Sequence, residues 1–355
     1  MPPWEIDDML TPKEALALKE KLDSSQRPLF IYHDDPDGLA SFLLCYRYLE
    51  RGKGFPLKAH PRIYRDPWAR KVTENDPDHV FILDIAMVEQ DFIDAVNAPI
   101  TWVDHHTVQE KERVTYYNPQ KRGVNVPTPE LIWQAIGTEK PNDLWIATVG
   151  AIGDWHYPHY APSFSEQMPD ILPLDAKTVQ QALYESPLGT LVKLFSFCLK
   201  GPTKEVYTNV KILTRIEHPS EILLQTTPAG KHLWKTYEYF NKHYEALKEK
   251  ALAHKSADKL FIWTYEEDKL SLTKDLANEL LYTFKDKIII LGRRKDGEYR
   301  CSLRAPAGVL LSKALEKALI GVEGYGGGHE QACGCAVKES DWERFLENLR
   351  RELKL

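Results

Sequence analysis

Three short apolar runs in the sequence each stop at acidic residues. They are IYHDDPD, which ends at Asp37, HVFILD, which ends at Asp84, and PITWVDHH, which contains Asp104. Runs this rich in β-branched and aromatic residues are typical of buried parallel strands. Helical patterns follow the first two runs, in DGLASFLLCYRYLE and VEQDFIDAVN. Strands that alternate with helices predict an α/β fold with an open parallel sheet.

The polar residues that end these runs predict a metal site. Parallel sheets bind ligands at the carboxyl ends of their strands, so the side chains that follow the strands should converge on one crevice. These side chains are Asp35, Asp37, Asp84, Asp104, His105 and His106. Carboxylates this close repel one another unless a cation lies between them. For the first run alone, a plain solvated turn at Asp-Pro-Asp-Gly is the alternative, but the recurrence of the pattern favours metal binding.

The ligand types indicate the metal. Carboxylates with some imidazole and no evident thiolate suit manganese or magnesium better than iron or zinc. We expect two divalent ions, with manganese first and magnesium as the alternative, because the carboxylates are too many for one ion. Asp84 stands alone at its strand end and is the predicted bridge between the ions, an arrangement that serves phosphoryl chemistry. A fourth apolar run, IATVGAIGD, reads as a helix or a strand and adds Asp154.

The order of these motifs resembles that of the DHH phosphoesterase superfamily, which includes RecJ-type exonucleases, nanoRNases and cyclic-dinucleotide phosphodiesterases. The matching motifs are H-x-D-x-D-G from His33 to Gly38, then Asp84, Asp104-His105-His106 and Gly153-Asp154. Near the other end, CSLRAP and GYGGGHEQACG are similar to the DHHA1 substrate domain that accompanies DHH domains. The resemblance covers most of the chain, from about residue 28 to 340. Among its members, the chain resembles the archaeal RecJ-like exonucleases and the nanoRNases.

The resemblance implies roles for the individual residues. One ion would be held by His33, Asp35 and Asp84, and the other by Asp37, Asp84, His105 and Asp154. Asp104 is expected to orient His105 from behind, and His106 to contact the scissile phosphate or the leaving oxygen. In the second domain a phosphate or terminal nucleotide would be held by Arg304, Gly326, Gly327, Gly328 and His329, because arginine binds phosphate in bidentate fashion and glycine lets backbone amides approach an anion. A plain structural loop is the alternative for the glycine run.

Length and composition give the domain plan. We expect a DHH catalytic domain over residues 1–200, a helical connector over 201–258 and a smaller α/β DHHA1 domain over 259–355, with a ligand-binding cleft between the domains. The sequence has no apolar run of membrane-spanning length and no leader, so we expect a soluble, cytoplasmic protein without membrane contacts. Five cysteines at irregular spacing are expected to be reduced thiols.

Charge and aromatic content bear on the substrate. A net charge of −6 argues against a broad basic surface, so nucleic acid should enter through a local groove. Candidate basic groups lie in NPQKRGVNVP, with Lys121 and Arg122, and in GRRKDGEYR, although solvated loops are the alternative for both. The segment GDWHYPHYAPSF carries Trp155, His156, Tyr157, His159 and Tyr160. These rings would either stack on exposed bases or pack into the fold, and the sequence leaves both open.

The predicted function is a two-metal phosphodiesterase that trims single-stranded RNA or DNA from an end and releases 5′-mononucleotides, as RecJ-like exonucleases do. The alternative is the same chemistry on short oligonucleotides, on 3′-phosphoadenosine 5′-phosphate or on cyclic dinucleotides. An inactive scaffold, like the replication factor with this fold, is disfavoured because every expected metal ligand is present. A P-loop is excluded, since GLAS after the aspartates lacks its lysine. A helicase or a replication or repair protein is the partner that family analogy suggests.

Overall fold

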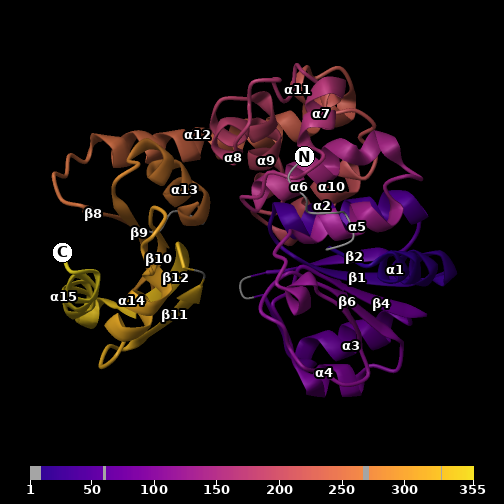
Figure 1. Cartoon of the computed structure of the whole chain (residues 1–355), viewed down its shortest axis with the longest axis horizontal. Coiled ribbons are helices and arrows are strands. Elements are labelled where there is room, and N and C mark those ends of the chain that lie inside the picture. The colour runs from indigo at the N-terminus through magenta and orange to yellow at the C-terminus, as the bar shows by residue number, and fades with distance from the viewer. Residues whose placement is uncertain (1–8, 59–60, 267–271, 329) are drawn as a thin grey trace. The chain divides into compact units, whose positions relative to one another are not determined.

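The computed structural model describes residues 9–58, 61–266, 272–328 and 330–355. The chain divides into two compact units, Met1–Tyr237 and Glu238–Leu355. Figure 1 shows the elements of both units, and the division falls inside the long helix α12 (Pro228–Ala253). Within the described residues, no helix has the length and apolar character needed to cross a membrane.

The first unit is built on the predicted parallel sheet. Its strands are β1 (Pro28–His33), β2 (Lys53–Leu57), β4 (His79–Leu83), β6 (Ile100–Val103) and β7 (Thr115–Tyr117). The strand order is β2-β1-β4-β6-β7, and every neighbouring pair is parallel. Parallel pairing brings the carboxyl ends of β1, β4 and β6 to one edge. The prediction of an α/β fold with a parallel N-terminal sheet is therefore confirmed.

Helices cover both faces of this sheet (Figure 1). Side chains alternate along β1, so that Leu29 and Ile31 belong to one core and Phe30 and Tyr32 to another. The first core contains side chains of α3 (Arg65–Asn75) and α4 (Gln90–Ala95). The second contains side chains of α1 (Pro12–Ser24), α2 (Pro36–Leu49), α5 (Thr128–Ile136) and α6 (Leu144–Gly153). Because both faces are buried, the strands read as continuous apolar runs rather than alternating ones.

The close approach of α2 and α6 depends on a glycine. A Cβ at Gly150 would lie 2.5 Å from the Cβ of Ala40, closer than side chains tolerate. The glycine therefore lets α6 lie directly against α2, and the two helices carry metal-ligand candidates at their ends, Asp37 on α2 and Asp154 after α6. The run that was ambiguous between helix and strand is this helix.

The rest of the first unit is helical. Residues 201–237 share its main core through Val206, Leu213, Ile222 and Leu233, so the predicted connector is divided between the two units. The remaining helices are α7 (Ala161–Gln167), α8 (Val179–Tyr184), α9 (Pro187–Cys198), α10 (Thr203–Leu213) and α11 (Ser220–Leu223). The short elements are β3 (Arg62–Ile63), β5 (Met87–Val88), η2 (Pro119–Arg122) and η3 (Pro141–Asp143).

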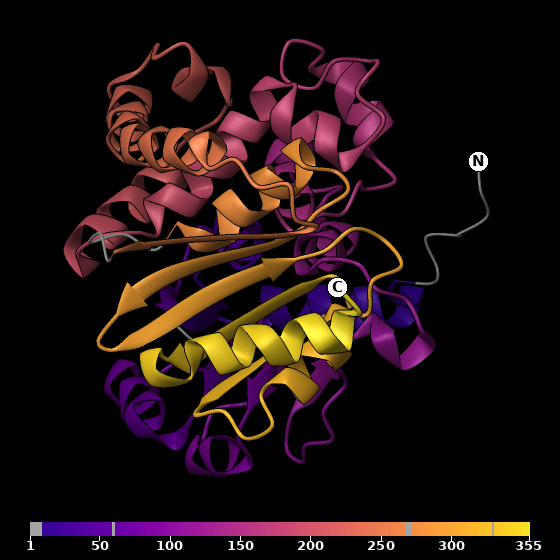
Figure 2. The same cartoon turned by 90° about the vertical axis from the view of Figure 1, so that its left-hand side faces the viewer.

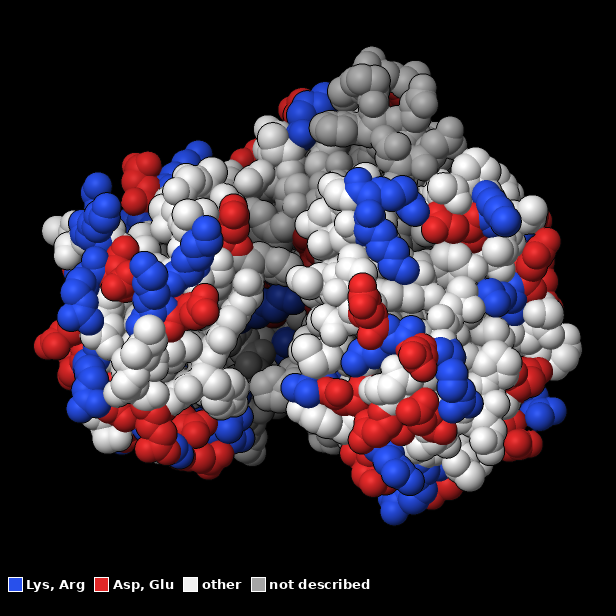
Figure 3. Space-filling view, turned by 60° about the horizontal axis from the view of Figure 1, so that its bottom comes forward, with Lys and Arg blue, Asp and Glu red and all other residues white. Residues whose placement is uncertain are grey.

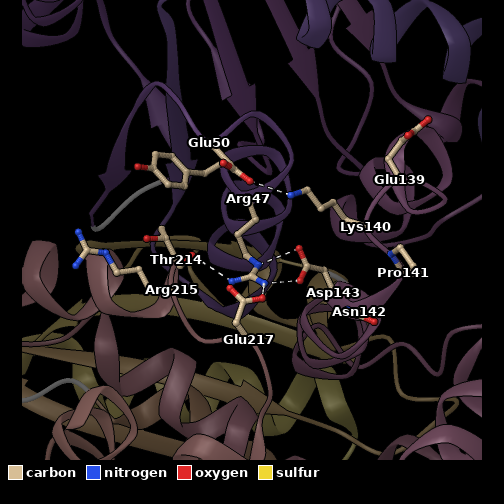
Figure 4. A pocket seen from close by; sticks show the side chains of 11 residues that line it. Arg47, Glu50, Glu139, Lys140, Pro141, Asn142, Asp143, Thr214, Arg215 and Glu217 are labelled. Atoms are coloured by element: carbon tan, nitrogen blue, oxygen red, sulfur yellow. Dashed lines mark hydrogen bonds and ion pairs between the residues drawn. The ribbon is translucent and has the colours of Figure 1, made fainter. Parts of the chain in front are cut away.

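A buried ion pair joins α2 to two later segments. The guanidinium of Arg47 lies 2.7 Å from an oxygen of Asp143 and 3.1 Å from one of Glu217, and it donates to the carbonyls of Thr214 and Ile216 (Figure 4). These contacts occupy the whole guanidinium fork. The pocket around Arg47 thus has a structural cation at its centre, which ties the residues after α10 to the first unit.

The second unit contains a smaller mixed sheet. Its elements are β8 (Leu260–Glu266), α13 (Thr273–Thr283), β9 (Ile288–Lys295), β10 (Glu298–Arg304), α14 (Leu311–Ala318), β11 (Gly324–Gly328), β12 (Ala332–Lys338), η4 (Glu339–Asp341) and α15 (Trp342–Leu353). The strand order is β11-β12-β10-β9-β8. Helices α14 and α15 pack on the face that carries Leu303 and Val337, while α13 contacts β9 and β10 through its own apolar stripe (Figure 2). The predicted smaller C-terminal α/β domain is confirmed, and the predicted cleft stays a prediction.

Candidate metal centre

The predicted ligands do gather at the carboxyl edge of the parallel sheet. His33 is the last residue of β1, Asp84 directly follows β4, and Asp104 directly follows β6. Backbone hydrogen bonds continue past the strand ends, from the Asp84 amide to the carbonyl of Val103 at 3.0 Å. The strand ends therefore hold these residues rigidly instead of presenting them on loose loops.

The Asp-Pro-Asp-Gly stretch begins a helix. Asp35 is the N-cap of α2 and accepts a hydrogen bond from the Gly38 amide at 3.2 Å, and Pro36 occupies the first helical position. A Cβ on Gly38 would lie 2.4 Å from the carbonyl oxygen of His33, so only glycine allows this helix to start so close to β1. The positive helix end lies beside Asp35 and Asp37 and favours their negative charge. The solvated-turn alternative is therefore wrong.

Two groups of ligand atoms share Asp84. In the first group, Nδ1 of His33 lies 3.0 Å from Asp35 Oδ2 and 3.4 Å from Asp84 Oδ2. In the second, Nε2 of His105 lies 3.4 Å from Asp84 Oδ1, and 3.8 and 3.6 Å from carboxylate oxygens of Asp37 and Asp154. Asp84 thus turns one oxygen to each group, as a bridging ligand must.

Three sets of residues place their ligand atoms within 4.8 Å of one another. They are His33-Asp35-Asp84, Asp37-His105-Asp154 and Asp84-His105-His106. The first two are the sets that the family resemblance implied for the two ions. The six proposed ligands therefore lie together, although their binding of metal remains a proposal.

Burial makes this cluster electrostatically demanding. Asp37 and Asp84 are each only 1% exposed, and among the described residues Asp37 Oδ1 and Asp84 Oδ2 have no hydrogen-bond partner. Burial, followed by repulsion from Asp84, raises the pKa of Asp37 well above its usual range. Burial opposes the charge of His33, but Asp35 and Asp84 together outweigh it and raise the pKa of that imidazole. Buried acceptors without donors fit a divalent cation, and the carboxylate and imidazole donors suit manganese or magnesium.

Backbone strain occurs at two positions beside the cluster. Asp84 has φ of 54° and Trp155 has φ of 61°, in the left-handed region that glycine normally occupies. The left-handed conformation of Trp155 belongs to a Schellman motif that ends α6. The amide of Trp155 donates to the carbonyl of Ile152, and the amide of His156 donates to the carbonyl of Ala151. This turn fixes Asp154 at the end of the helix. Strain of this kind is commonly found at functional sites.

Asp104 contacts a different histidine from the one predicted. Its Oδ1 lies 2.7 Å from Nδ1 of His106, and its Oδ2 accepts from the backbone amide of His106 at 3.0 Å. His105 instead places its Nδ1 3.2 Å from Oδ1 of Asn125. The expectation that Asp104 orients His105 is therefore wrong. The physical reason is that Tyr116, at 3.1 Å, turns the Asp104 carboxylate toward the His106 side of the loop.

The predicted substrate residues of the second unit lie on two strands of its sheet, β11 and β10, which are separated by β12. Gly326, Gly327 and Gly328 form most of β11, and a Cβ on Gly327 would meet no atom within 4 Å. Arg304, on β10, is 8% exposed, and its guanidinium donates to the carbonyl of Leu303 and contacts Asn278. His329 lies outside the described residues. The assignment of these residues to substrate binding stays a proposal.

The predicted basic groups are used within the fold. Arg122 pairs with Glu14, Lys121 lies over the ring of Tyr116, and Arg294 pairs with Glu266 and Glu339. On the face seen in Figure 3, Lys and Arg are interspersed with Asp and Glu, and no broad basic area is visible. Lys121 and Arg122 lie in η2 and Arg294 lies in β9, so solvated loops do not describe these groups, and a binding groove formed by them stays a prediction.

Sequence reasoning missed a more basic stretch. The segment RGKGFPLKAHPRIYRDPWARK, residues 51–71, contains seven Lys or Arg and one Asp. It includes β3, which pairs with β5, and β5 begins three residues after Asp84. Arg62 and Arg65 therefore lie near the carboxyl edge of the sheet, and among the described residues Arg65 has no ion pair. The local excess of basic residues was the signal that could have found it.

The aromatic segment after Asp154 is largely packed. Trp155 and Tyr157 pack against the main core, Tyr157 donates to the carbonyl of Ala176 at 2.6 Å, and Tyr160 is buried. Of the two open alternatives, packing therefore describes these three rings. The two histidines of the segment behave differently and are described below.

Comparison with known proteins agrees with the motifs. The model of the DHHA1 domain matches residues 267–355. No curated protein matches the sequence.

Solved structures share the fold of the chain at low identity. RecJ from Thermus thermophilus, in complex with Mn²⁺, aligns with a TM-score of 0.65 and 16% identity over 99% of this chain and 56% of that one. The DHH domain of a protein assigned to a family of ribosomal proteins aligns with a TM-score of 0.68 and 16% identity over 97% and 90% of the two chains. A pGpG-specific phosphodiesterase from Vibrio cholerae aligns with a TM-score of 0.51 and 13% identity over 93% of this chain and 99% of that one.

The chain spans about half the length of the Thermus RecJ structure, so the likeness concerns the common DHH and DHHA1 core. The low identities show a shared fold and leave the substrate open. Together, the DHHA1 match over residues 267–355 and the shared fold confirm the resemblance to the DHH/DHHA1 phosphoesterase superfamily that the motifs predicted.

Proposed function

We propose that this protein is a two-metal phosphodiesterase that hydrolyses single-stranded nucleic acid from an end. The observation that carries the proposal is Asp84, a buried carboxylate that directs one oxygen to each of two ligand groups. Two ions bridged by a carboxylate are the usual arrangement for cleaving phosphodiesters. RecJ structures that share the fold were determined with Mn²⁺ and with Mg²⁺, which supports a choice between these two metals.

The six ligand candidates would hold the ions, with Asp84 shared between them. When bound, divalent cations activate water and offset the negative charge that develops on the phosphate. The protein's own contribution begins with rigidity, because strand ends and helix ends fix every ligand before substrate arrives. Preorganisation of this kind avoids reorganisation during the reaction.

His106 is the proposed proton donor to the leaving oxygen. Asp104 holds its Nδ1, so a contact with substrate would go through Nε2. Burial opposes the charge of His106, but Asp104 outweighs it and raises the pKa of the imidazole. A raised pKa favours the protonated form of the imidazole, which is the form that a general acid needs.

The second unit is proposed to hold the terminal nucleotide. Gly327 offers backbone without a neighbouring side chain, and Arg304 lies on a strand of the same sheet. Arg62 and Arg65 would attract the rest of the strand toward the carboxyl edge. An inactive scaffold is not supported, since all six ligand candidates are present and close together.

A second candidate is the same chemistry on short substrates such as dinucleotides or 3′-phosphoadenosine 5′-phosphate. The observation that favours it is the mixed charge on the face seen in Figure 3, which offers little to a long strand. The pGpG-specific phosphodiesterase is covered over 99% of its length, so the chain also has the size of an enzyme for a dinucleotide.

A digestion series would test the proposal. Metal-stripped protein receives Mn²⁺ or Mg²⁺ and end-labelled RNA or DNA strands of two to about twenty nucleotides, the longer ones spanning several binding positions. A ladder that shortens from one end supports the exonuclease, and cleavage limited to the shortest strands supports the second candidate. Cleavage that persists in Asp84→Asn would contradict both candidate functions. Arg304→Ala should raise KM, and an unchanged KM would remove the second unit from substrate binding.

A further inference from the structure

Glu130 is a buried carboxylate that the proposed chemistry does not use. It lies in the first turn of α5, is 1% exposed, and neither of its oxygens has a hydrogen bond among the described residues. Its nearest partners are two imidazoles: His156 Nε2 lies 3.2 Å from Oε1, and His159 Nδ1 lies 3.7 Å from Oε2. Burying a carboxylate is costly unless nearby groups compensate for it, and the two imidazoles face both of its oxygens.

This group adjoins the second set of metal-ligand candidates. The amide of Thr128, at the start of α5, donates to Asp37 Oδ2 at 3.2 Å, and Glu130 follows in the same turn of helix. His156 comes two residues after Asp154, beyond the strained turn at Trp155. The helix that carries Glu130 therefore contacts one ligand candidate, and the loop that carries the imidazoles contains another.

Packing alone does not account for the two histidines. The aromatic rings between and beside them turn into the core, as described above. His156 and His159 instead keep 34% and 42% of their side chains exposed. One imidazole buried against Glu130 would be enough to anchor the loop, whereas here two imidazoles face the carboxylate and both stay partly exposed in the loop that follows Asp154.

We propose that His156 and His159 together bind the phosphate next to the scissile one, and that Glu130 positions both rings. Glu130 faces Nε2 of His156 and Nδ1 of His159, which leaves the opposite nitrogen of each ring for the ligand. A ring N–H on that nitrogen donates to a phosphate oxygen. The inference rests on the proposed function, because it names how that site would hold a second phosphate of the same substrate.

Three thymidine dinucleotides would test it in the presence of Mn²⁺. TpT contains only the scissile phosphate, pTpT adds a phosphate on the 5′ side, and TpTp adds one on the 3′ side. In the unmodified protein, one added phosphate should raise kcat/KM by roughly 10- to 100-fold, the usual effect of a charge-assisted hydrogen bond. The double variant His156→Ala/His159→Ala should lose that gain and cleave TpT within about twofold of the unmodified protein.

Glu130→Gln and a control complete the design. Glu130→Gln keeps the shape of the side chain and should lose part of the same gain, while His218→Ala, which removes an exposed imidazole from another turn, should lose none. An equal loss on all three dinucleotides in either site variant would mean a purely structural anchor and would overturn the inference alone. No cleavage of any dinucleotide or longer strand by the unmodified protein would instead overturn the proposed function, and this inference with it.

Discussion

The polar residues at the two ends of the parallel sheet differ in how their hydrogen bonds are satisfied. At the amino end, the carboxylate of Asp78 accepts hydrogen bonds from the backbone amides of Gln26 and Arg27, at 2.7 and 2.9 Å. The next residue, His79, shares a hydrogen bond of 2.8 Å with Thr101. Each of these polar groups joins neighbouring segments of the fold, so this end is organised for stability.

The carboxyl end of the same strands leaves comparable groups unsatisfied. Asp37 and Asp84 are almost fully buried, and each has an oxygen without a hydrogen-bond partner in the described part of the chain. Asp84 also has a strained backbone. Unsatisfied and strained groups lower stability unless a ligand compensates for them. Both ends of the sheet carry polar side chains, but only the carboxyl end has buried polar atoms that lack hydrogen-bond partners among the described residues. The contrast indicates that such atoms, rather than the number of polar side chains, mark the end that binds a ligand.

Asp84→Asn should show the largest effect at the carboxyl end. Loss of the shared carboxylate should lower kcat/KM on any cleaved oligonucleotide by at least about 10³-fold, or roughly 4 kcal/mol of transition-state stabilisation. The thermal midpoint of the metal-free variant should stay near that of the unmodified protein, because the change also removes the repulsion between Asp84 and Asp37. Steady-state kinetics and thermal unfolding of the same preparations would check both. Activity that survives would contradict the bridging role.

A bound metal ion should stabilise the folded protein through the unsatisfied carboxylates at the carboxyl end of the sheet. It should not change the hydrogen bonds at the amino end. Mn²⁺ at about 100 times its dissociation constant should stabilise the protein by about 2.7 kcal/mol, since it binds only the folded cluster. Thermal unfolding with and without Mn²⁺ would show the shift, and Asp84→Asn should reduce it. If the metal-free protein and the loaded protein unfolded at the same temperature, the cluster would not be a metal site.

Asp78→Ala is the matched change at the amino end. It removes the acceptor of two backbone amides, so the free energy of unfolding should fall by about 1.5–3 kcal/mol, the usual contribution of hydrogen bonds to a charged group. Activity per folded molecule should stay within twofold. Denaturant unfolding and kinetics would separate the two ends: a variant that stays stable but loses activity would break the comparison.

The sequence predicted the central strands and the gathering of the ligands for a physical reason. β1, β4 and β6 are buried on both faces, so they read as apolar runs, and the parallel arrangement then brings their ends together. The edge strands escaped prediction. β2 contains Gly54 and Pro56, and β7 has three residues, so each is held by pairing with its neighbour and has no clear pattern of its own.

Contacts between side chains from distant segments could not be predicted. The partner of Asp104 is decided by Tyr116 and the turn of the loop rather than by sequence order. Glu130 lies in a helix whose apolar pattern gives no sign that its carboxylate meets two histidines of a later loop. The division of residues 201–258 likewise depends on which core the apolar side chains reach. Periodicity locates elements, whereas these outcomes depend on tertiary packing.

The smallest predicted effect sharpens the comparison through pH. Burial, with Lys21 adding to it, lowers the pKa of His79 from 6.5 to about 4. On acidification the imidazole of the unfolded chain is protonated near pH 6.5, whereas that of the folded protein is protonated only near pH 4. This contribution to stability is therefore complete above pH 6.5 and is lost as the pH falls toward 4. With screening by solvent, we expect a loss of about 1 kcal/mol at pH 5.

His79→Gln would isolate that contribution, because glutamine keeps a polar group near Thr101 and does not titrate. Denaturant unfolding at pH 7.5 and pH 5 should show a smaller loss in the variant than in the unmodified protein, by about 1 kcal/mol. Protons also act on the metal-ligand candidates, but that part is common to both proteins and cancels in the difference. If the two proteins lost the same free energy of unfolding on acidification, the lowered pKa of His79 would not contribute to stability. The contrast between the amino and carboxyl ends of the sheet would then depend on hydrogen bonds alone.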